Sequence, residues 1–263
     1  MPIRHLIAYC AALTLVVAPP ELGAEEAANP SSWEKISDAL RGSLTVGIYH
    51  HFEEAKQEAT NTRYQAQLEL EFEGEIQDHL HYFLTPQLYL DNLGWASGIV
   101  NEEPETSTDR FIVDVEEAYM RYTAEKLDLT LGRQIFNWGV ADAFNPNNNI
   151  NPLDLLDVPT LKKMGVFSGT LRYSDENLNA SLVVIPWFTP ARIPGDNSRW
   201  QGDLGEAASQ FSGFDLTVGP RELPDKTLDN AAYALRFGSS TLLSGWDIAV
   251  SFYDGIDSIG VLR

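Results

Sequence analysis

The chain has 263 residues, of which 38 are acidic and 18 are basic, so its formal net charge is −20. Hydrophobic residues make up 44% of the sequence and aromatic residues 11%, which is too apolar for a disordered chain. Phosphate binding needs clusters of Lys and Arg that this sequence lacks, so no nucleic-acid partner is expected. The single cysteine excludes a disulfide framework and a cysteine-ligated metal site.

Residues 1–24 have the pattern of an export signal. Arg4 supplies a positive start, and an unbroken apolar run follows from Leu6 to Ala18. That run is shorter than the roughly 20 residues that a membrane-spanning helix needs. We expect cleavage after Ala24, which also removes Cys10. Residues 25–41 are then a short N-terminal periplasmic segment, in which residues 32–40 have the pattern of an amphipathic helical turn or two.

From residue 43 onward, apolar and polar residues alternate with a period of two, which is typical of β-strands. The clearest case is residues 63–73, where Leu68 and Leu70 alternate with Glu69 and Glu71. The pattern predicts nine strands. Their ranges are 43–52, 63–73, 79–90, 110–122, 127–137, 165–174, 179–188, 229–238 and 246–255.

The connections between these strands alternate between long and short. The long ones are 53–62, 91–109, 138–164 and 189–228, and the short ones are 74–78, 123–126, 175–178 and 239–245. Membrane barrels have long extracellular loops and short periplasmic turns. We therefore predict an all-β fold for residues 42–263, an antiparallel up-and-down transmembrane β-barrel. Such barrels have even strand numbers, so nine strands predict that this is the N-terminal part of a larger barrel. The alternative is a half-buried sheet in a secreted β-sandwich.

Strand parity assigns a set of charged residues to a watery lumen. Arg133 needs a further argument, because simple alternation places it with Leu129 and Leu131 on the lipid side. A β-bulge at Gly132 turns it inward at little cost. Opposed charges across a narrow pore create a field that filters solutes, although the same charges can serve only as ion pairs that stiffen the wall. The predicted pore-lining residues are Glu69, Glu71, Glu73, Glu117, Arg121, Arg133, Arg172 and Arg236.

Residues 127–200 contain the segments LDLTLGRQIFNWGVADAFNPNNNINPLDLLDVP and VVIPWFTPARIPGDNSRW. This region resembles the uncharacterised porin-like outer-membrane proteins of Gram-negative bacteria that share a GRQ…NWG…NP.D signature. It is also similar to the GRQ-bearing strand of alginate-export barrels. The resemblance implies an exported β-barrel with a transport role in the outer membrane, and it transfers no substrate.

Two other kinds of site receive less support from the sequence. Loop 138–164 is rich in oxygen ligands that suit calcium, but their spacing matches no EF-hand; the loop is better explained as folding into the lumen to narrow it. The residues concerned are Asp142, Asn145, Asn147, Asn148, Asn149, Asn151, Asp154 and Asp157. His50 or His51 with an acid would form a hydrolase dyad, but no nucleophile motif accompanies them. Aromatic residues near strand ends fit a membrane-rim girdle. They are Tyr49, Tyr82, Tyr122, Tyr173, Trp187 and Trp246.

The sequence therefore predicts a porin-like channel that passes small hydrophilic solutes, with no enzyme activity, cofactor or metal. Its expected partners are outer-membrane lipid and lipopolysaccharide, the barrel-assembly machinery and, optionally, further copies of itself. A secreted β-sandwich that binds carbohydrate through Trp187 and Trp200 is the alternative from another class, and an outer-membrane hydrolase is the third.

Overall fold

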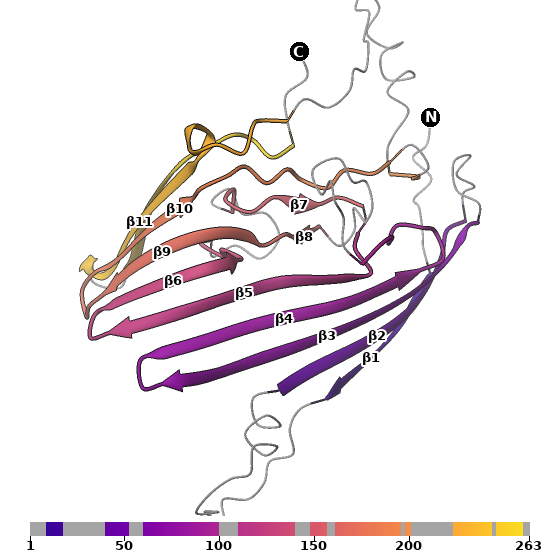
Figure 1. The fold of residues 1–263 in the computed structure, drawn as a ribbon, viewed down its shortest axis with the longest axis horizontal. Coiled ribbons are helices and arrows are strands. Elements are labelled where there is room, and N and C mark those ends of the chain that lie inside the picture. The colour runs from indigo at the N-terminus through magenta and orange to yellow at the C-terminus, as the bar shows by residue number, and fades with distance from the viewer. Residues whose placement is uncertain are drawn as a thin grey trace, which may run out of the picture.

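Ten long antiparallel strands form one continuous sheet, in which each is hydrogen-bonded to the long strands that precede and follow it (Figure 1). The computed structural model describes residues 9–17, 40–52, 60–99, 110–139, 148–156, 161–195, 198–200, 223–243 and 246–259. The long strands are β1 (Tyr9–Val17), β2 (Leu40–His50), β3 (Thr62–Gln77), β4 (Leu80–Asp91), β5 (Val113–Ala124), β6 (Leu127–Gln134), β9 (Val166–Ser174), β10 (Asn179–Ile185), β11 (Ala232–Leu243) and β12 (Trp246–Asp254). Two short strands, β7 (Leu153–Asp154) and β8 (Lys162–Lys163), pair separately, and η1 (Leu228–Asn230) is a 3-10 turn.

The nine strands predicted from the period-two pattern are confirmed as β2 to β6 and β9 to β12. The all-β class and the antiparallel up-and-down order are also confirmed. Several boundaries differ by three to five residues, in β2, β3, β5, β6, β10 and β11. The strand predicted over 127–137 ends at Gln134, because residues 135–139 leave the sheet. The strand predicted over 229–238 begins at Ala232 and continues to Leu243.

The tenth strand, β1, lies within the predicted export signal. Its register on β2 runs from Tyr9 opposite His50 to Val17 opposite Gly42. The run contains no Gly or Pro, so its backbone can form a regular ladder. Leu13 is 75% exposed, so this side chain adds little packing to the pairing. The export signal stays a prediction, and cleavage after Ala24 would remove β1 and leave β2 at the sheet edge.

The register places apolar and polar residues in alternate rows across the sheet. One row crosses six strands and is entirely apolar or aromatic. It contains Tyr122, Leu129, Leu171, Leu182, Leu235 and Phe252. The neighbouring row on the other face is mostly polar. It contains Thr123, Asp128, Arg172, Ser181, Arg236 and Ser251. The residues of the apolar row are exposed, which is the reverse of a water-soluble sheet packed on a core.

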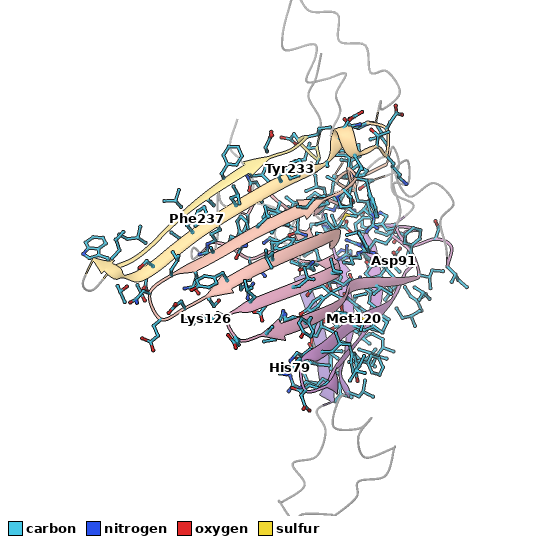
Figure 2. All side chains as sticks on the ribbon, turned by 60° about the vertical axis from the view of Figure 1, so that its left-hand side comes forward. His79, Asp91, Met120, Lys126, Tyr233 and Phe237 are labelled. Atoms are coloured by element: carbon cyan, nitrogen blue, oxygen red, sulfur yellow. The ribbon has the colours of Figure 1, made fainter. Side chains whose placement is uncertain are left out.

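The sheet is curved, and β7 and β8 lie in its hollow (Figure 1). The exposed apolar side chains of the long strands belong to the convex face, and Met120, Tyr233 and Phe237 are three of them (Figure 2). The concave face receives a small apolar core instead. Phe136, Trp138 and Ile150, which lie between β6 and β7, pack there against β9 to β11. None of the described residues forms a helix with the length and hydropathy of a membrane span.

The tight turns gather at one end of the strands. His79 and Lys126 lie in two of these turns, and Asp91 lies at the opposite end (Figure 2). An exposed ion pair joins two neighbouring turns, with Lys126 Nζ 2.7 Å from Asp175 Oδ2. Tyr173 donates a hydrogen bond to the same carboxylate oxygen at 3.0 Å. The hydrogen bond from Lys126 is the main cause that lowers the pKa of Asp175, with the Tyr173 bond adding to it.

This turn contact predicts a local dependence on pH. Because the folded-state pKa of Asp175 is depressed, the contact contributes stability above the ordinary carboxyl pKa and loses it as pH falls through the folded pKa. We expect the Asp175 carboxyl resonance to titrate at lower pH than an aspartate side chain in an unstructured peptide. Lys126→Gln should raise the pH at the midpoint of the Asp175 titration. An unchanged midpoint would show that the ion pair is absent in solution.

Gly132 in β6 is the residue whose backbone depends most clearly on the lack of a side chain. Its φ is +135°, and a Cβ added there would lie 2.2 Å from the carbonyl oxygen of Ala118. A non-glycine residue in this region costs of order 1–3 kcal/mol. Gly132→Ala should therefore lower the urea unfolding free energy by at least this amount. Gly169→Ala is the control, because its nearest contact is the flexible Leu131 Cδ2 at 3.3 Å. Equal losses in the two variants would refute the argument.

Candidate functional site

The segment that follows β6 is held in the hollow of the sheet by one amide side chain. Asn151 Oδ1 accepts a hydrogen bond from Phe136 N at 2.7 Å. Its Nδ2 donates to the carbonyl oxygens of Gln134 at 3.0 Å and Met164 at 2.9 Å. Asn151 is itself buried. It therefore joins the end of β6 to the residues that enter β9, and the segment between them turns into the hollow.

A second attachment is the buried carboxylate of Asp154 in β7. Arg110 Nε donates to Asp154 Oδ2 at 2.9 Å and Arg110 Nη2 to Oδ1 at 3.3 Å. Arg192 Nη1 donates to Oδ2 at 2.7 Å from the segment that follows β10. The Asp154 side chain is only 4% exposed. One carboxylate thus connects three segments that are far apart in the sequence.

The ion pairs continue from Asp154 to the wall formed by β3, β4 and β5. Asp114 accepts from Arg133 Nη1 at 3.1 Å and lies 3.9 Å from Arg192 Nη2. Lys162 Nζ in β8 lies 3.1 Å from Glu116 Oε2 and 3.7 Å from Glu69 Oε2. We call this set the hollow network. Its members are Glu69, Arg110, Asp114, Glu116, Arg133, Asp154, Lys162 and Arg192.

A cavity of about 80 Å³ lies beside the hollow network. The amides of Gln65, Gln67 and Gln87 line it from β3 and β4. Gln67 Nε2 donates to Gln87 Oε1 at 3.4 Å, and Lys162 Nζ donates to the same oxygen at 2.9 Å. The remaining lining residues are Tyr89, Arg110, Phe111, Asp114, Asp154, Lys162 and Arg192.

Two of the predicted pore-lining acids meet groups in the hollow. Glu69 belongs to the hollow network. Glu117 Oε1 accepts a hydrogen bond from Ile135 N at 2.8 Å, so it helps to turn the chain after β6. The other two predicted acids on β3 lie outside the hollow network. Glu71 lies 3.4 Å from Arg41 in an exposed pair, and Glu73 is exposed.

Of the predicted basic residues, Arg133 belongs to the hollow network and the other three do not. Arg121 donates to Thr130 Oγ1 at 3.4 Å. Arg172 and Arg236 lie in the polar row of the concave face, on either side of Ser181 in β10. The structure places neither of them in the hollow network. The predicted set therefore shares a face, but only part of it gathers around one cavity.

Arg133 reaches the hollow network by a different route from the one predicted. The β6 pairings are continuous, with Arg133 opposite Ala118 and Phe167, so no register shift marks a bulge. The positive φ of Gly132 instead turns the chain before Arg133. Arg133 Nε donates to the carbonyl oxygen of Gly165 at 3.2 Å, and Nη1 reaches Asp114.

Six members of the hollow network are absent from the sequence-based pore set, namely Arg110, Asp114, Glu116, Asp154, Lys162 and Arg192. Strand alternation does not identify them, because Arg110, Lys162 and Arg192 lie in or beside loops. Asp114 and Glu116 lie where the β4–β5 register shifts between Leu84 and Pro86. The one usable signal is Asp154, which belongs to the NP.D motif and which the sequence presents as a candidate calcium ligand.

The other candidate residues have structural contacts. His50 Nδ1 is hydrogen-bonded with Thr62 Oγ1 at 2.9 Å, and His51 is buried with its ring 6.1 Å from Trp200. Trp187 stacks on Phe167 of β9 at 4.9 Å, so the two tryptophans contact parts of the sheet that β3 to β6 separate.

The predicted calcium loop is only partly described. Asn148 Oδ1 accepts from Trp138 N at 3.1 Å, and Asn151 and Asp154 are engaged as above. Asp142, Asn145, Asn147 and Asp157 lie outside the described residues. Within the part of the chain that the structure describes, no group of three His, Cys, Asp or Glu side chains is placed to hold a metal ion.

No protein-family model, no curated protein and no solved structure matches the chain. The resemblance of residues 127–200 to porin-like proteins therefore stays a prediction.

The buried position of Asp154 predicts a large effect of its removal. Breaking a buried ion pair costs about 3–5 kcal/mol, because the partner charges are left uncompensated. We expect Asp154→Asn to lower the urea unfolding free energy by about 3 kcal/mol, with a change in tryptophan fluorescence as Trp138 loosens. Asp175→Asn, which breaks an exposed pair, is the control and should change the unfolding free energy far less. Similar losses would show that the hollow network does not hold the inward segment.

Proposed function

We propose that this chain forms the wall of a porin-like channel in the outer membrane of a Gram-negative cell, through which small hydrophilic solutes diffuse. In this proposal the sheet is part of a transmembrane β-barrel, with its convex face against lipid and its concave face toward water. The implied partners are membrane lipid, lipopolysaccharide and the barrel-assembly machinery.

The observation that carries the proposal is the inverted distribution of side chains. Exposed apolar residues cover the convex face of successive strands, whereas the concave face bears Asp, Arg, Ser and Thr. Exposed apolar patches of this extent are rare on soluble monomers and mark interaction with a membrane or a partner. The strands β2 to β5 have 11 to 16 residues, which covers the roughly 9–11 residues that a tilted strand needs in hydrocarbon.

The inward segment supports the channel function in particular. Residues 135–139 and 148–156 fill part of the hollow, and the hollow network holds them against the wall. A barrel narrowed in this way admits solutes by size, and fixed charges on the wall filter them. The proposal requires both edges of the sheet to be paired in the membrane, because unpaired backbone groups in hydrocarbon cost several kcal/mol each. Among the described strands, β1 and β12 each have one neighbour.

Adjacent residues on β3 provide a matched test of the membrane orientation. Leu70 belongs to the convex face and Glu71 to the concave face, at nearly the same depth. In a bilayer, Leu70→Arg should lower the unfolding free energy by roughly 2–4 kcal/mol, because arginine on the lipid face is costly near the midplane. Glu71→Arg should cost much less, because its side chain stays in water and its partner Arg41 is exposed. Urea unfolding of the full chain in lipid vesicles measures both.

The channel function itself is tested by fractionation and conductance. The full chain expressed in a Gram-negative host should be recovered with the outer membrane and should need detergent for extraction. The purified protein should give stepwise ion conductance in planar bilayers. Recovery in the soluble periplasm without detergent, or equal costs for Leu70→Arg and Glu71→Arg, would contradict the membrane barrel.

A further inference from the structure

Two residues that line the cavity beside the hollow network each have a buried polar atom without a hydrogen-bond partner among the described residues. These atoms are the guanidinium nitrogen Nη1 of Arg110 and the amide oxygen Oε1 of Gln65. A buried polar group left unpaired costs about 1–3 kcal/mol. One of the two atoms donates and the other accepts, so a group that satisfies both must be able to accept and donate.

The position of Arg110 is fixed independently of any ligand. Its Nε and Nη2 are engaged by Asp154, and its guanidinium lies 4.7 Å from the centre of the Tyr89 ring. The third nitrogen is therefore oriented without an additional contact. A binding group held in advance in this way loses little conformational freedom when a ligand arrives.

The charges around the cavity compensate one another. The hollow network contains four cations, Arg110, Arg133, Lys162 and Arg192, and four carboxylates, Glu69, Asp114, Glu116 and Asp154. With all of these groups ionised, their sum is zero. An incoming ion would pay for its desolvation without gaining an uncompensated counter-charge. A neutral solute avoids this loss.

We propose that the cavity is a binding site for the hydroxyl groups of a neutral polyhydroxylated solute, such as one edge of a sugar ring. A hydroxyl accepts a hydrogen bond from Arg110 Nη1 and donates one to Gln65 Oε1, as its chemistry allows. The amides of Gln67 and Gln87 line the same cavity and offer further polar contacts. This inference rests on the proposed channel function, and it identifies the class of solute that binds to the channel wall.

Equilibrium binding in detergent micelles tests the site separately from conduction. D-glucose titrated into the full chain should give saturable heat. Gluconate and glucosamine, which carry a negative and a positive charge, should bind more weakly. Triethylene glycol dimethyl ether, which has acceptors but no hydroxyl donor, should show no saturable binding. Saturable glucose binding without conductance would refute the channel and keep the site, whereas conductance without glucose binding would refute the site alone.

Substitutions on one strand assign the binding to the cavity. Gln65→Leu should weaken glucose binding roughly tenfold, because it removes the acceptor. Glu73→Gln, further along β3 and outside the cavity lining, should leave it unchanged. If circular dichroism shows that Gln65→Leu does not fold, Gln65→Asn, which keeps the amide but withdraws it, should also weaken binding. Unchanged affinity in the folded Gln65 variant, or tighter binding of gluconate than of glucose, would overturn the proposal.

Discussion

The structure depends on one geometric constraint, which is that successive side chains of a strand point to opposite faces of a sheet. Antiparallel pairing with a continuous register extends this alternation from a strand to a whole row. From Tyr122 on β5 to Phe252 on β12, every residue of one row is apolar or aromatic. A one-residue slip would exchange the faces of a strand, and in β6 or β9 it would place Asp128 or Arg172 among the apolar residues. The pairing is therefore specified strongly, although no second sheet packs against the convex face among the described residues.

A curved sheet with a polar concave face leaves a hollow that must be filled or hydrated, and here the chain after β6 fills part of it. The apolar anchor of Phe136, Trp138 and Ile150 meets the part of the concave face where Val183, Ile185 and Ala234 replace polar residues. In the polar part of the hollow, the side chains of Asn151 and Asp154 connect the inward segment to the rest of the chain. Loop backbone inside a hollow carries polar groups that need partners. Asn151 supplies one acceptor and two donors to the main chain at that point.

The strands were predictable from the sequence because they depend on local alternation, which residues 63–73 display almost without interruption. Prediction failed at positions whose backbone and contacts do not depend on the alternation of apolar and polar residues. Gly132 was identified as the point of change, but its effect comes from a positive φ rather than from an extra residue in the ladder. The partners of Asp154 lie 44 and 38 residues away along the chain, at Arg110 and Arg192. No periodic pattern relates residues in three separate loops, so the hollow network required coordinates.

The β1 pairing shows why a ladder by itself is weak support for function. Any apolar run without Gly or Pro can add to the edge of a sheet through its backbone, and Tyr9–Val17 does so along its whole length. Leu13 and Thr14 of β1 do follow the faces of β2, since Leu13 lies opposite Val46 and Thr14 opposite Thr45. In residues 10–17, however, Thr14 is the one hydroxyl or charged side chain, whereas β2 to β6 and β9 to β12 each carry two or more polar residues that alternate with apolar ones.

The distribution of charge separates the hollow network from the rest of the chain. The chain carries a net charge of −20, yet the hollow network sums to zero. The acid excess therefore belongs to residues outside this network, and the sequence concentrates acids in segments such as 101–109 and 203–230. At physiological salt, exposed charges act over about 8–10 Å. Within the compensated network itself, hydrogen bonding and shape rather than net charge would therefore govern the passage of a solute.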